Sequence, residues 1–130
     1  MKRKISKNKE MMIPILNNTY GVVVCWGEDK FIRNVGKMYH YPDEIEPLPK
    51  YVRGRCYEYH NPNLHPIIVL PGKPITSEEI GTLAHEATHA VEVIFNNINE
   101  KNIGEFFAHS VGAIVREVLR DGKGKYELDK

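Results

Sequence analysis

The most informative stretch of this 130-residue chain is ITSEEIGTLAHEATHAVEVIF, residues 75–95. Thr76 and Glu79 have the spacing of a capping box, in which each side chain accepts a hydrogen bond from the other residue's backbone N–H. Apolar residues then recur at the spacing of one helical face. They are Ile80, Leu83, Ala84, Ala87, Val91, Ile94 and Phe95. Together these features predict an amphipathic helix over residues 77–95.

His85 and His89 lie four residues apart in this predicted helix, and therefore one turn apart on the same face. Two imidazoles placed in this way can bind one Zn²⁺ through nitrogen. Glu86 follows the first histidine, where a carboxylate can reach a zinc-bound water and act as the general base. We therefore expect one Zn²⁺ per chain, with Glu86 as the catalytic residue. The alternative is a pair of surface histidines beside an ordinary exposed glutamate.

A catalytic zinc has three protein ligands and one open position. A second helix is predicted over residues 103–120, and Glu105 near its start is the predicted third ligand. His109 shares the face of Glu105 and is an alternative third ligand. We favour a role for His109 in which it hydrogen-bonds a ligand and fixes its orientation. Gly112 on the same face is expected to let the two helices approach closely.

The rest of the chain predicts a small α+β domain with about three strands. Residues 20–26 are β-branched and aromatic, which is typical of a buried strand. Residues 55–60 and 66–70 are expected to form a hairpin. Apolar spacing in residues 28–41 favours a short helix that begins at Asp29. The predicted helices cover one face of the sheet.

The bulk properties limit where the chain acts and what it binds. A formal net charge of +1 argues against a specific nucleic-acid surface, and the sequence has no apolar run long enough to span a membrane. Residues 1–12 carry a cluster of lysine and arginine and are expected to be a disordered tail, which leaves residues 13–130 as a single domain. Cys25 and Cys56 lie in apolar segments and are expected to be free, buried thiols. A cytoplasmic location is the expectation.

These motifs resemble those of a known family. Gly81 to Val91, with the HExxH pattern at His85 to His89, resembles the active-site helix of zincin metallopeptidases. Glu105-Phe106-Phe107-Ala108 is similar to the Glu-x-x-Ala/Ser element of the gluzincin branch. The resemblance implies that His85, His89 and Glu105 are zinc ligands and that Glu86 is the general base. His109 stands where that branch often has Asp. Over residues 19–120 the layout resembles compact zincin-like proteins of phages and prophages.

The resulting expectation is a zinc-dependent metallopeptidase that hydrolyses a peptide or protein substrate. Residues 66–70 are expected to be the edge strand on which extended substrate docks. Tyr57 and Tyr59 are possible donors to a developing oxyanion, although a place on the sheet face is favoured. A zinc-stabilised binding or regulatory module without turnover is the main alternative, and metal-dependent hydrolysis of a non-peptide substrate is a third. The pattern does not specify an oligomeric state.

Overall fold

The computed structural model describes residues 8–59, 61, 63–97 and 104–120. The elements follow in the order β1 (Lys9–Ile15), β2 (Tyr20–Trp26), α1 (Asp29–Met38), β3 (Arg55–Tyr57), β4 (Ile67–Val69), α2 (Ser77–Asn97) and α3 (Gly104–Arg120). The α+β class and all three expected helices are confirmed. Within the described residues, the sheet has four strands where about three were expected.

The strand order across the sheet is β1-β2-β4-β3. β2 pairs with β1 antiparallel and with β4 parallel, whereas β3 pairs with β4 antiparallel. The pairing of β3 with β4 confirms that the segments expected to form a hairpin are antiparallel neighbours. The prediction that residues 66–70 form an edge strand is wrong, because β4 has a paired strand on each side. β3 is the edge strand on this side of the sheet.

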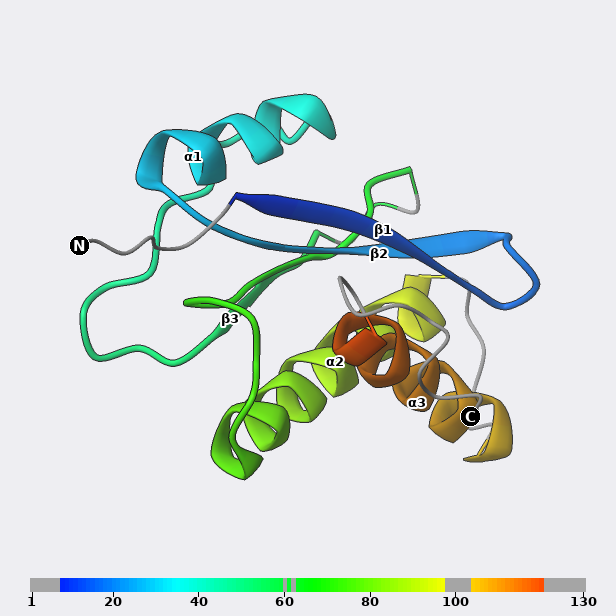
Figure 1. Cartoon of the computed structure of the whole chain (residues 1–130). Coiled ribbons are helices and arrows are strands. Elements are labelled where there is room, and N and C mark those ends of the chain that lie inside the picture. The colour runs from blue at the N-terminus through cyan, green and yellow to red at the C-terminus, as the bar shows by residue number, and fades with distance from the viewer. Residues whose placement is uncertain (1–7, 60, 62, 98–103, 121–130) are drawn as a thin grey trace.

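The sheet is covered on both faces (Figure 1). β2 alternates between them: Val22 and Val24 pack with residues of α2 and α3 in one core cluster, and Val23 and Cys25 pack with residues of α1 in the other. This alternation is the period of two that a strand imposes on its side chains. The expectation that the helices cover one face is therefore corrected, since α1 lies on the face opposite α2 and α3.

The N-terminal strand β1 lies partly in the segment expected to be a tail. Residues 9–12 belong to this strand and pair with β2 from Trp26 back to Val23, whereas residues 1–7 lie outside the described part of the chain. Asn17 and Asn18 form the connecting turn with positive φ angles, a conformation that asparagine tolerates well. Pro14 is accommodated because β1 is an edge strand, where a missing N–H costs little.

The start of α2 is fixed by the capping box. The Thr76 hydroxyl accepts a hydrogen bond from the Glu79 N–H at 3.1 Å, and a Glu79 carboxylate oxygen accepts from the Thr76 N–H at 3.0 Å. The same oxygen accepts from the Ile75 N–H at 2.8 Å. These bonds satisfy backbone donors that the first turn of a helix leaves without partners. The helix therefore begins where predicted, which sets the position of every side chain along it.

Cys25 and Cys56 are both free thiols. Cys25 is buried, as expected, and burial raises the pKa of its thiol to about 12. Cys56 is only partly buried by exposed area, but burial is still the main cause that raises its pKa. Within the described residues, no helix is long and apolar enough to cross a membrane.

Candidate functional site

His85 and His89 stand together on the outer face of α2. Their Nε2 atoms are 3.2 Å apart, and the ring centroids are 4.7 Å apart with the rings nearly perpendicular. His85 is exposed, and 45% of the His89 side chain is accessible. Both lie away from the stripe of Leu83, Ala87 and Val91 that faces the core. The pair therefore presents two ring nitrogens to solvent.

The separation of the two nitrogens fits a shared Zn²⁺. Two nitrogens bound to one tetrahedral zinc at about 2.0–2.1 Å stand about 3.3–3.4 Å apart. The observed separation between His85 Nε2 and His89 Nε2 is 3.2 Å. The same distance also suits a hydrogen bond in which one imidazole donates and the other accepts. Metal binding and this hydrogen bond are mutually exclusive uses of the same two atoms.

Glu92 lies beside the other nitrogen of His89. Its carboxylate oxygen is 3.8 Å from His89 Nδ1, on the next turn of α2. At 3.8 Å this contact is longer than a hydrogen bond, and both side chains are substantially accessible to solvent. The two nitrogens of His89 therefore have distinct surroundings, with Glu92 on one side and His85 on the other.

Glu86 is buried, with only 8% of the residue exposed. It points from α2 toward the segment that leads into β3. A Cβ placed on Gly54 would stand 3.3 Å from Glu86 Cγ and 2.9 Å from Thr82 Cγ2. The absence of a side chain at Gly54 therefore lets α2 approach the backbone just before the edge strand. The charge of Glu86 also contributes to the raised pKa of Cys56, after burial and Glu58.

A hollow of about 440 Å³ lies beside His85, between α2 and the two residues just before β3, and we call it the histidine hollow. Its lining includes Arg53, Gly54, Glu78, Thr82, His85 and Glu86. One imidazole of the pair and the buried carboxylate therefore border the same open space. A small group held in this hollow can contact a carboxylate and an imidazole at once.

Glu105 and His109 lie elsewhere on the molecule. Glu105 is nine residues before the buried Ile114, and nine residues are two and a half helical turns. Glu105 is therefore exposed on the side of α3 opposite its core face. His109 lines a different hollow, of about 420 Å³, between α3 and the turn that joins β1 to β2.

The packing expected at Gly112 does not occur. A Cβ placed there would meet only Arg116 Nη1 of the same helix, at 3.9 Å. Close helix contact is made instead by larger side chains, for example Phe107 against Phe95 with ring centroids 5.5 Å apart. The face that carries Gly112 and Glu105 is thus not the face that α3 turns toward α2.

The described part of the chain holds two of the expected ligands together. Within residues 8–59, 61, 63–97 and 104–120, no group of three or more His, Cys, Asp or Glu side chains is close enough to hold a metal ion. His85 and His89 form a pair, and Glu86 lies beside them, but Glu105 and His109 do not join this pair.

Tyr57 and Tyr59 are engaged on the α1 side of the sheet. The Tyr57 hydroxyl accepts from the Glu46 N–H at 3.0 Å and donates to the Glu46 carbonyl at 3.2 Å. The Tyr59 hydroxyl donates to Asp43 at 2.6 Å. Both therefore hold the loop after α1 against the sheet, as the favoured sheet-face interpretation predicts.

Two residues of the site escaped the sequence analysis. Arg53 and Gly54 come from a segment without a recognised motif, yet both line the histidine hollow. A glycine just before a strand can indicate that another backbone or helix approaches closely. Gly54 occupies such a position, so the sequence could have predicted the close approach of α2. Nothing in the local sequence marks Arg53.

Comparison of the chain with protein families, with curated proteins and with solved structures found no match.

Proposed function

We propose that this protein is a zinc-dependent hydrolase of peptide bonds, with His85 and His89 as zinc ligands and Glu86 as the general base. The observation that carries the proposal is the 3.2 Å separation of the two Nε2 atoms, because it suits two ligands of one tetrahedral zinc.

Zinc at this pair would supply Lewis acidity, which polarises a carbonyl and lowers the pKa of a coordinated water. Glu86 accepts a proton from a water molecule in the histidine hollow and returns it to the leaving amine. Its burial against Gly54 holds the carboxylate in one place. Substrate aligns along the free edge of β3, because within the described residues this strand has a paired neighbour on one side only.

The two histidines leave coordination positions for water, for substrate and for a third protein ligand. Glu105 is the residue that the gluzincin resemblance implies for this role. In the arrangement described above, it would need α3 to rotate about its axis, since Glu105 lies opposite the core face. The third ligand is therefore the part of the proposal that mutagenesis must decide.

The test compares zinc-loaded wild type with Glu86→Gln on a mixture of unstructured peptides, read by mass spectrometry. Gln keeps the size of Glu86 but cannot accept the proton. We expect cleavage by wild type, loss of cleavage by at least 100-fold in the variant, and equal zinc content in both. Equal cleavage by the two proteins would refute the role of Glu86.

A second function is favoured by the open surroundings of the histidine pair. With both imidazoles exposed and two protein ligands in place, zinc could serve binding rather than turnover. This alternative, a zinc-stabilised binding or regulatory module, predicts that zinc-loaded wild type cuts no peptide of the mixture while zinc still stabilises the fold.

A further inference from the structure

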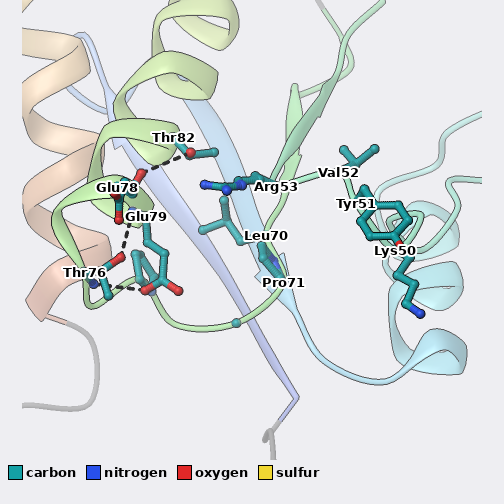
Figure 2. Close-up of a pocket in the computed structure, with 12 residues that line it drawn as sticks. Lys50, Tyr51, Val52, Arg53, Leu70, Pro71, Thr76, Glu78, Glu79 and Thr82 are labelled. Atoms are coloured by element: carbon teal, nitrogen blue, oxygen red, sulfur yellow. Dashed lines mark hydrogen bonds between the residues drawn. The ribbon is translucent and has the colours of Figure 1, made fainter.

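A second, larger hollow adjoins the histidine hollow, and we call it the outer hollow. Its volume is about 680 Å³, and it is enclosed by residues 50–53, by residues 70–74 and by the first turns of α2 (Figure 2). Arg53, Glu78 and Thr82 line both hollows. The two spaces are therefore neighbours, and a peptide that reaches the histidine pair can extend into the outer hollow.

The floor of the outer hollow is apolar. Leu70 is only 4% exposed, and Pro74 is buried beside it. Val52 and Pro71 add further apolar surface to the lining. A hollow with this floor and an open top suits an apolar side chain, because burial removes its surface from water.

The charges of the outer hollow are divided between its two walls. Lys50 and Arg53 stand on the wall that leads into β3, and Glu78 and Glu79 stand on the α2 wall. Glu79 is occupied, since its carboxylate accepts the two backbone N–H groups of the helix cap. Those bonds are also the main reason that its pKa is lowered.

Arg53 is the cation at the junction of the two hollows, one residue before Gly54, and the described residues leave its N–H donors unused. It is exposed, its guanidinium makes no hydrogen bond with another described residue, and Figure 2 shows it extended toward α2. Its charge is one of the smaller causes that lower the pKa of Glu79. A guanidinium whose N–H groups make no hydrogen bond offers paired donors that match the two oxygens of a carboxylate.

We propose that Arg53 binds a carboxylate of the substrate, next to an apolar residue held in the outer hollow. This inference rests on the proposed peptidase function, and it names the substrates as peptides with an apolar residue beside a carboxylate. That carboxylate belongs either to an acidic side chain or to the C-terminus of the peptide. Lys50 lies over the Tyr51 ring at 5.7 Å. Arg116 is an exposed arginine of α3 that lines neither of these two hollows, and it serves as the matched control.

The test measures binding to the zinc-free chain, so that it does not depend on hydrolysis. The probes are acetyl-Ala-Leu with a free C-terminal carboxylate, the same dipeptide as its amide, and acetyl-Ala-Leu-Glu amide with its Gln counterpart. Affinity is read from the shifts of the backbone amides of residues 51–54 and 78–82 in two-dimensional ¹⁵N spectra. Inorganic phosphate serves as the competing simple anion.

We expect at least one carboxylate probe to bind about tenfold more tightly than its uncharged counterpart. Whichever pair shows the preference identifies the source of the carboxylate. Arg53→Gln should remove the preference, Arg53→Lys should keep part of it, and Arg116→Gln should leave it unchanged.

The proposal is overturned if neither carboxylate probe is preferred, if the preference survives in Arg53→Gln, or if phosphate competes as well as the peptides do. The outcomes also separate this inference from the proposed function. A carboxylate preference that depends on Arg53 in a protein without peptidase activity would leave the site standing and refute the peptidase. Peptidase activity without that preference would refute the site alone.

Discussion

Zinc should stabilise the folded chain through His85 and His89, and the size of this effect can be worked out in advance. The two Nε2 atoms already stand 3.2 Å apart, so the pair needs little rearrangement to bind one ion. A ligand that binds only the folded state adds about 2.7 kcal/mol when its free concentration is 100 times its Kd. For a domain of this size, that corresponds to a rise of roughly 10 °C in the midpoint of thermal unfolding.

Each variant of the histidine pair or its neighbours should remove a different share of the stabilisation by zinc. His85→Ala or His89→Ala removes one of the two nitrogens, and nearly all of the zinc-dependent shift should vanish. Glu92→Gln removes the carboxylate that lies 3.8 Å from His89 Nδ1. If this carboxylate closes to hydrogen-bond distance when the metal binds, its loss should weaken metal binding by about 10-fold. At the same zinc concentration, a 10-fold weaker site retains about 1.4 kcal/mol. His109→Ala, which removes an imidazole from the far side of α3, should retain the full shift.

The assay is thermal unfolding followed by circular dichroism, with and without zinc, on protein stripped of metal by a chelator. Zinc binding by Cys25 and Cys56 in the unfolded chain would reduce the shift, but equally in every variant. The reasoning is refuted if His89→Ala is stabilised by zinc as strongly as wild type. In that case, the close approach of the imidazoles is the hydrogen bond described above, and the metal binds elsewhere.

Three further results are expected. Gly54→Ala should lower the free energy of unfolding by about 1–3 kcal/mol in urea titrations, because the new Cβ would stand 2.9 Å from Thr82 Cγ2. Adding Thr82→Ser removes that methyl group and should restore part of the lost stability. If the double variant recovers no stability, this contact is not the cause. The N–H donors of Thr76 and Ile75 lower the pKa of Glu79, so the stability that its ionised carboxylate contributes is present above the ordinary pKa of 4.5 and is lost as the pH falls through the lowered value. The difference in free energy of unfolding between wild type and Glu79→Gln should therefore shrink in acid. A difference independent of pH would argue against the cap. Glu105→Ala should leave zinc affinity unchanged by isothermal titration, because Glu105 faces away from α2, whereas loss of tight binding would show that α3 rotates to supply it as the third ligand.

The parts of the fold that the sequence predicts are those set by local rules. The capping box at Thr76 and Glu79 and the apolar stripe after it define α2, and helical geometry then places His85 beside His89. α1 and α3 are also found where their spacing indicates. Each of these elements depends on residues within a few turns of one another.

Sequence-based predictions were wrong for some of the strands, whose pairing depends on contacts between distant segments. No local pattern reveals that β4 pairs with β2 from much earlier in the chain, and this pairing is what makes β4 an inner strand. β1 was missed because Pro14 and the neighbouring lysines are poor strand signals, although an edge strand tolerates them. Glu105 lies on the exposed side of α3, and its half-turn offset from Ile114 can be counted in the sequence. Its role as the third ligand stays a prediction.

The exposure of the histidine pair has a consequence for which metal the chain would carry. Two imidazoles on an open helix face impose neither a cavity size nor a fixed coordination number. Their affinity for divalent ions would therefore follow the general order in which Cu²⁺ exceeds both Ni²⁺ and Zn²⁺. The metal held by His85 and His89 would be set by the ions supplied, including nickel from a purification column, rather than by the chain itself.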